Sequence, residues 1–228
     1  MNRTKIPWVT NPDGSAGFTS NPVRRQCLHN CPYCYAEKIR QRYKQPAEVS
    51  FHPEELEKIR RRKKPATIFM GSMHDIFGDW VPDEWIHKII STTQECPQHT
   101  FLFLTKNPER YANLYIPENC WLGYTDTGEH DYRNWVHLRY FKNTFVSCEP
   151  LLGSNLNINF DVIKWLIVGS LNINGAAVNP DHGGTAFDSA LLITSVATIS
   201  GIPVFTKPEL KKMYPTLPSF CDMPYLKK

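Results

Sequence analysis

Apolar and polar residues alternate along the chain in blocks that have the lengths of strands and helices. Short and nearly continuous apolar runs occur at residues 66–70, 100–105, 120–124, 144–148, 165–169 and 204–206. Runs of this kind are typical of strands that are buried on both faces of a parallel sheet. We therefore predict a strand at each of these positions.

The segments between the apolar runs have features of helices. Residues 35–43 are rich in Ala, Glu, Lys, Arg and Gln, which favour helices. A helix is also predicted to begin at Pro82, because proline and the two acidic residues that follow it suit a first helical turn. Further helices are expected at residues 108–114, 132–141 and 186–200.

Strand–helix alternation predicts an α/β fold built on a parallel sheet. A partial (β/α)6 TIM-like barrel fits the six strands, and a doubly wound sheet is the alternative. The chain has 228 residues, of which 41% are hydrophobic, and this suits a single domain with a well-developed core. We expect the core to extend from about residue 20 to residue 207, followed by a C-terminal tail over residues 208–228.

Composition adds a mildly basic character, with a net charge of +4 and a pI of about 8.6. No apolar run is long enough to span a membrane, and the first residues lack the apolar stretch of a signal peptide. Seven cysteines are an odd number in a chain too large to depend on disulfides. This favours a reducing compartment, and we expect a cytoplasmic protein.

Three cysteines, Cys27, Cys31 and Cys34, stand within eight residues of one another. Thiolates are the preferred ligands of iron–sulfur centres, and three of them can hold three irons of a four-iron cluster. No further cysteine lies nearby in the sequence, so one iron would be open to a ligand from outside the protein. The remaining cysteines are scattered and form no second motif: Cys96, Cys120, Cys148 and Cys221.

Two other readings of the cysteine motif are a zinc site and a set of ordinary buried thiols. Zinc usually takes four protein ligands that come in paired Cys or His units. Only one C-x-x-C pair, Cys31 and Cys34, is present here, although His29 lies inside the loop.

Polar residues follow several of the predicted strands. In barrels the chemistry is carried where strands run into the following loops. Gly71, Ser72 and Asp75 follow the strand at 66–70, while Lys106 and Lys207 each follow another strand. A lysine at such a place suits a carboxylate or a phosphate, and a solvated loop lysine is the alternative.

The strand at 144–148 ends in a further candidate pair. Side chains alternate along a strand, so Ser147 and Glu149 share one face and Cys148 points to the other. We therefore expect Cys148 to pack as a small hydrophobic residue. Near the cysteine motif, Arg24 and Arg25 are candidates for contacting an anionic substrate. The basic run at residues 60–64 is interpreted as a solvated helix end, and a nucleic-acid patch is the alternative.

The cysteine motif has three residues and then two between its cysteines, with Tyr33 before the last one. It resembles the signature of the radical S-adenosylmethionine (radical SAM) superfamily and, with Tyr35 and Ala36 after it, the spore photoproduct lyase-like branch. A wider set of segments resembles a phage-associated, largely uncharacterised radical-SAM-like family. These segments are residues 72–77, 104–110, 148–153 and 165–169, and the resemblance covers most of the chain from 26 to 207.

The resemblance implies a partial barrel that binds a [4Fe–4S] cluster and SAM. It implies that the reduced cluster cleaves SAM to a 5′-deoxyadenosyl radical, which abstracts hydrogen from a substrate, and that an external one-electron reductant is needed. The chain departs from the usual Gly-Gly-Glu segment for the SAM amino group, where Ser72 or Asp75 would be the acceptor. The candidate SAM contacts are Tyr33, Gly71, Ser72, Asp75, Lys106, Ser147 and Glu149.

The sequence leaves the substrate open. The basic excess, Arg24 and Arg25 near the motif, and the lyase-like motif suggest a nucleic-acid base or a nucleotide, and Lys207 is a further substrate candidate. A small metabolite or a peptide is the alternative within the same chemistry. Outside it, the chain could be a non-catalytic iron–sulfur or zinc protein that binds a partner.

Overall fold

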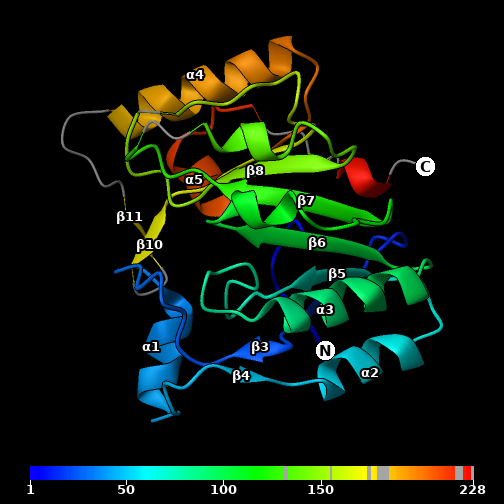
Figure 1. Cartoon of the computed structure of the whole chain (residues 1–228). Helices are drawn as coiled ribbons and strands as arrows, with labels where there is room; N and C mark the ends of the chain where they lie inside the picture. The colour runs from blue at the N-terminus through cyan, green and yellow to red at the C-terminus, as the bar shows by residue number, and fades with distance from the viewer. Residues whose placement is uncertain (131–132, 155, 174–175, 179–184, 219–222, 227–228) are drawn as a thin grey trace. The chain divides into compact units, whose positions relative to one another are not determined.

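The computed structural model describes residues 1–130, 133–154, 156–173, 176–178, 185–218 and 223–226 (Figure 1). The chain divides into two compact units, Met1–Leu122 and Gly123–Lys228, and each is described by itself. Of the described residues, none forms a helix that combines the length and hydrophobicity needed to cross a membrane. The single domain with a C-terminal tail stays a prediction.

The fold is a mixed α/β structure with a mostly parallel central sheet of eight strands. The strand order is β1-β2-β5-β6-β7-β8-β9-β12, and β7 covers Cys120–Thr125, where a strand was predicted at 120–124. The α/β class predicted from the sequence is thus confirmed.

In the first unit the sheet is formed by β1 (Asn2–Arg3), β2 (Phe18–Ser20), β5 (Thr67–Met70) and β6 (Thr100–Thr105). β2, β5 and β6 are parallel, and Ile68 of β5 pairs with Phe18 and with Phe101. Every residue of β5 is buried, as expected for an apolar strand with neighbours on both sides. The strands predicted at 66–70 and 100–105 are confirmed, whereas β2 was not predicted.

The helices of the first unit are α1 (Tyr35–Arg42), α2 (Glu54–Arg61) and α3 (Asp83–Glu95). The two predicted helices that begin near residues 35 and 82 are confirmed. α2 and α3 lie side by side (Figure 1). Residues predicted to form a helix at 108–114 form one turn of 3-10 helix instead, Pro108–Tyr111. A short separate sheet pairs β3 (Val23–Arg24) with β4 (Ser50–Phe51).

In the second unit β8 (Thr144–Cys148), β9 (Leu166–Val168) and β12 (Val204–Thr206) are parallel neighbours. Ile167 of β9 pairs with Ser147 on one side and with Phe205 on the other. The strands predicted at these three places are confirmed. Among the described residues of this unit, β10 (Leu171–Ile173) also pairs with β11 (Ala176–Val178) in the antiparallel direction, and neither strand was predicted from the sequence.

The second unit also contains α4 (Thr185–Ile199) and α5 (Pro208–Met213). α4 confirms the helix predicted at 186–200. The helix predicted at 132–141 is wrong: its first residue lies outside the described residues, and the rest contains one 3-10 turn, Asn134–His137. A second 3-10 turn covers Pro224–Leu226. Leu210 and Leu217 of the expected tail are buried, so this part of the chain belongs to the packed structure.

Candidate functional site

The cysteine motif forms a half-buried loop between β3 and α1, and its three thiols are free. Two tight turns shape the loop: the Asn30 N–H donates to the Cys27 carbonyl oxygen at 3.3 Å, and the Cys34 N–H donates to that of Cys31 at 3.0 Å. Asn30 has a φ of +49°, which asparagine tolerates better than most residues. Cys34 is the N-cap of α1, so the third cysteine stands directly at a helix start.

Cys27 is the cysteine most closely held by its surroundings. Burial raises the pKa of its thiol to about 11, although the backbone N–H groups of Asp75 and His29 donate to the sulfur and act in the opposite direction. Without a cation nearby, Cys27 is therefore a neutral thiol at pH 7. The same two N–H groups would stabilise a thiolate once a metal ion balances its charge.

The Asp75 carboxylate joins the cysteine loop to the ends of β5 and β6. Its Oδ2 lies 2.8 Å from His29 Nε2 and accepts hydrogen bonds at 2.9 Å from the Thr105 hydroxyl and the Lys106 backbone N–H. Burial raises the pKa of Asp75, but these donors outweigh it and hold the pKa below its usual range. The predicted SAM acceptor thus already receives several donors from its own chain.

His74 and Trp80 make further contacts with the cysteine loop and with Arg25, which precedes it. The Trp80 indole N–H donates to His74 Nε2 at 2.9 Å, so a neutral His74 carries its proton on Nδ1, which faces the Arg25 carbonyl oxygen at 3.4 Å. Burial lowers the pKa of His74 and favours this neutral form. Trp80 also packs edge-on against His29, with 4.9 Å between the ring centroids.

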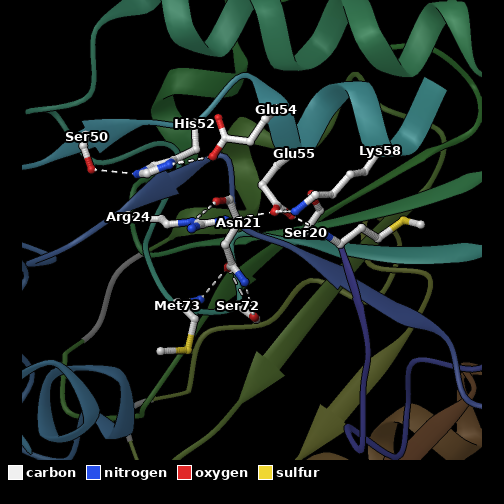
Figure 2. Close-up of polar contacts among 11 residues, drawn as sticks. Ser20, Asn21, Arg24, Ser50, His52, Glu54, Glu55, Lys58, Ser72 and Met73 are labelled. Atoms are coloured by element: carbon white, nitrogen blue, oxygen red, sulfur yellow. Dashed lines mark hydrogen bonds and ion pairs between the residues drawn. The ribbon is translucent and has the colours of Figure 1, made fainter. Parts of the chain in front are cut away.

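The segment after β5 is fixed beside the same loop. Gly71 has a φ of +78°, and a Cβ at this position would lie 2.7 Å from the His74 carbonyl oxygen, so only glycine fits. The Asn21 amide donates to the Ser72 hydroxyl at 3.2 Å and accepts from the Met73 N–H at 2.9 Å, as Figure 2 shows. The Tyr35 hydroxyl donates to the Ser72 carbonyl oxygen, which ties this segment to α1.

Lys106 links the end of β6 to the aromatic residue of the motif. Its ammonium lies 5.7 Å from the centre of the Tyr33 ring, a cation–π contact. All the SAM candidates of the first unit therefore gather at the cysteine loop: Tyr33, Gly71, Ser72, Asp75 and Lys106. Asn21, His29 and Trp80 bring these residues together; the sequence pointed to His29 only beside the zinc alternative and did not identify Asn21 or Trp80.

Arg24 is engaged with the chain itself. Its guanidinium lies 2.9 Å from the buried Glu55 carboxylate and donates to the Asn21 carbonyl oxygen at 3.0 Å (Figure 2). Glu55 also binds Lys58 at 2.5 Å and the Met1 ammonium group. Burial raises the pKa of Glu55, but Lys58 and the Met1 ammonium outweigh it and lower the pKa to about 2.

The same view shows how β4 is joined to the start of α2. His52 Nε2 lies 3.0 Å from the Ser50 hydroxyl, and His52 Nδ1 lies 2.8 Å from the Glu54 carboxylate (Figure 2).

Arg25 stands apart from this network. It has a φ of +87° and is half-buried, and the structure places its backbone beside His74.

The strand ends of the second unit carry the other candidates. Lys207 forms an ion pair with Glu149, so the lysine expected to hold an external anion faces a carboxylate of its own chain. Gly169 leaves room for this pair, because a Cβ there would lie 2.9 Å from Lys207 Cδ. Ser147 is 1% exposed, and its carbonyl oxygen accepts the Asp126 N–H at 3.0 Å.

Cys148 is fully buried, which agrees with the packing role expected from strand alternation. Burial and the nearby Asp126 carboxylate raise the pKa of the Cys148 thiol well above its usual range. Burial also raises the pKa of Tyr124, and Cys148 and Asp126 add to this. Tyr124 and Asp126 follow no local motif and were not identified from the sequence.

No three His, Cys, Asp or Glu side chains in the described part of the chain are positioned to hold a metal ion together. The donor chemistry of the loop nevertheless suits an iron–sulfur cluster. It offers three thiols on one short loop, a helix start at Cys34, and two backbone N–H donors to Cys27.

These features define an α/β protein with a mostly parallel sheet and a cysteine loop tied to strand ends. The chain belongs to the family described as "Protein of unknown function (DUF5131)", whose model matches residues 3–180. The matched part includes the cysteine loop and the strand ends up to β9, while Lys207 lies beyond it. None of the curated proteins and none of the solved structures compared with the chain matches it.

Proposed function

We propose that this protein is a radical SAM enzyme in which Cys27, Cys31 and Cys34 hold a [4Fe–4S] cluster. The observation that supports the proposal most strongly is the junction at Asp75. There the cysteine loop meets the end of β6 and the segment that follows the adjacent parallel strand β5. Strand ends around a cofactor loop are where barrel enzymes place their chemistry. The mostly parallel sheet is compatible with the partial (β/α)6 barrel that belongs to this proposal.

Bound cluster and SAM would supply reductive cleavage of SAM to methionine and a 5′-deoxyadenosyl radical, which takes a hydrogen atom from the substrate. The chain's own residues would bind and orient the cluster and SAM. The N–H groups of Asp75 and His29 would stabilise the thiolate of Cys27 when it binds the cluster. Lys106, held over the Tyr33 ring, would supply a positive charge for the SAM carboxylate, and the Gly71 turn would allow close approach of the backbone.

For the substrate we propose a nucleic-acid base or a nucleotide, and a small metabolite or a peptide is the alternative. Basic residues favour an anion: the first unit contains 17 Lys and Arg against 13 Asp and Glu, and the second contains nine against nine. Because Arg24 is paired with Glu55, Arg25 is the better candidate of the two for a phosphate contact. A cytoplasmic location remains part of the proposal.

The test is anaerobic reconstitution with iron and sulfide, followed by reduction in the presence of SAM. We expect about four irons per chain, a change in the electron-spin signal when SAM is added, and release of 5′-deoxyadenosine. The variants Cys27→Ala, Cys31→Ala and Cys34→Ala should each lose the cluster. Cys96→Ala is the matched control, since Cys96 is a buried cysteine outside the motif, and it should keep the cluster.

Two outcomes would contradict the proposal. A stoichiometric, redox-silent zinc bound by the three cysteines in anaerobically purified protein would favour the zinc alternative. A reducible cluster whose signal is unchanged at saturating SAM, with no 5′-deoxyadenosine formed, would favour a non-catalytic iron–sulfur protein.

A further inference from the structure

Helix α1, which starts directly after Cys34, exposes an apolar face. Tyr35, Ile39 and Tyr43 recur every fourth residue and are 54%, 37% and 66% exposed. Residues four apart lie on the same side of a helix. Leu28, within the cysteine loop, is another exposed apolar residue, at 47%. We refer to these four residues as the α1 face.

The exposure of the α1 face is unusual for a short helix. Isolated helices of this length are marginal in water and depend on burying an apolar side. α2 has the same length as α1 and buries Leu56 and Ile59, whereas none of the residues of α1 is buried. Exposed apolar surface of this kind, bordered by polar residues, marks an interaction site.

The border of the α1 face is basic. Glu37 accepts two hydrogen bonds of 2.7 Å from the Arg40 guanidinium, so these two residues neutralise each other. This leaves Lys38, Arg42 and Lys44 as exposed cations, and Arg42 lies 5.8 Å from the centre of the Tyr43 ring. A partner that covers the face must therefore present an apolar patch within an acidic border.

We propose that the α1 face is the docking site of a small acidic one-electron carrier protein. The inference rests on the proposed function, which needs an external reductant for the cluster. The face includes a residue of the cysteine loop and a helix that begins at Cys34, so a docked carrier lies against the loop itself. The reduced carrier gives up one electron and the cluster accepts it, with no bond made or broken.

A single-stranded nucleic acid is the other basic-surface ligand to consider, and the residues favour a protein. Nucleic-acid strands bind on aromatic rings on which successive bases stack. Only Tyr35 and Tyr43 of the α1 face have rings, whereas Leu28 and Ile39 offer apolar surface on which no base can stack and which suits an apolar patch on a protein.

The first experiment measures binding without any cluster. The protein is titrated with a reduced flavodoxin, an acidic one-electron carrier, at several salt concentrations. We expect saturable binding that weakens as salt rises. The variant Lys38→Glu/Lys44→Glu should bind at least tenfold more weakly, and Ile39→Ser severalfold more weakly. The control Arg61→Glu/Lys63→Glu makes the same charge change at exposed residues near the end of α2 and should stay within twofold of the wild type.

The second experiment separates this proposal from the proposed function. Dithionite, which needs no docking site, should reduce the reconstituted wild type and all variants at equal rates. Flavodoxin should reduce Lys38→Glu/Lys44→Glu at least tenfold more slowly than the wild type and the control. If flavodoxin and dithionite each reduce the wild type and all variants at equal rates, the docking-site proposal is overturned. The proposed function is not affected by that result.

Other results overturn the docking site or its premise. Absence of saturable flavodoxin binding at low salt overturns the docking site. It is also overturned if a single-stranded oligonucleotide displaces flavodoxin from the wild type and binds the variant Lys38→Glu/Lys44→Glu more weakly. The α1 face would then be a nucleic-acid binding site. If no cluster forms that dithionite can reduce, the proposed function fails together with the inference that rests on it.

Discussion

At the scale of single residues, Asp75 has the most consequential position in the first unit. Its side chain is 8% exposed and receives donors from the cysteine loop and from the end of β6. A largely buried carboxylate with several donors is stable only while those donors stay in place. Asp75 is therefore expected to set the position of the cysteine loop, whatever the loop binds.

The variant Asp75→Asn tests this role. An amide keeps the shape of the side chain but loses the charge and half of the acceptor capacity. We expect the free energy of unfolding to fall by about 2–3 kcal/mol, the size of a lost hydrogen-bonded charge. Urea denaturation measures it. Asp79→Asn is the control, because Asp79 is exposed and accepts a hydrogen bond of 2.7 Å from the Asn107 side-chain amide, and this substitution should cost less than about 1 kcal/mol. Equal losses in the two variants would contradict the role of Asp75.

The pKa of Glu55 predicts a dependence of stability on pH. The pKa lies near 2 in the folded chain, against 4.5 for an unperturbed glutamate, so the unfolded chain binds more protons between these values. The contribution of Glu55 is fully present above about pH 4.5 and is lost as the pH falls towards 2. In Glu55→Gln the free energy of unfolding should drop by about 1–3 kcal/mol at pH 7. The difference from the wild type should shrink between pH 4.5 and 2 in acid titrations of urea unfolding. A constant difference over this range would contradict the assignment.

The residues of the site differ in how far they could be predicted. The cysteines are recognisable because their spacing is local, within eight residues. His29 and Asn21 act through Asp75 and Ser72, which lie 46 and 51 residues away, and such pairings are decided by tertiary folding. The pairing of Arg24 with Glu55 was missed for the same reason, since their side chains are 31 residues apart in the chain.

At the scale of elements, continuous apolar runs proved the most reliable signal. β5, β6, β8 and β9 are strands where such runs occur, because each has neighbouring strands on both sides and is buried on both faces of the sheet. Elements with few apolar residues were predicted less fully: of α2, only its basic end at residues 60–64 was recognised as a helix end. Leu56 and Ile59 are the only apolar residues of α2, and both are buried. The other residues of α2 are charged, so its apolar pattern does not stand out in the sequence.

Gly71 offers a test at the end of β5. In Gly71→Ala the added Cβ meets the His74 carbonyl oxygen at 2.7 Å and Ile76 Cδ1 at 2.9 Å, and the φ of +78° is itself unfavourable. Gly14→Ala is a matched control, since Gly14 has the same φ with nothing within 4 Å of its added Cβ. We expect Gly14→Ala to cost about 1 kcal/mol and Gly71→Ala about 2 kcal/mol more in urea denaturation. A difference near zero would mean that the turn after β5 can rearrange freely.

At the scale of the whole molecule, the basic excess lies in one part of the chain. The first unit carries 17 basic and 13 acidic side chains, and the second carries nine of each. The unit with the excess is the one that contains the cysteine loop. An uneven charge distribution of this kind raises the local concentration of anions near the basic part.

This distribution underlies the prediction of a nucleic-acid substrate. Single-stranded oligonucleotides should bind the reconstituted protein with an affinity that falls as salt rises, because phosphate contacts release counterions. A single strand is the better probe, since a base in a duplex must first leave its stack to reach a buried reaction centre. Arg25→Ala should weaken binding severalfold. Arg139→Ala makes the same charge change at an exposed residue of the second unit and should have little effect. Binding is measured by fluorescence anisotropy over a salt series. No binding at low salt, or equal losses in the two variants, would favour a small metabolite as the substrate.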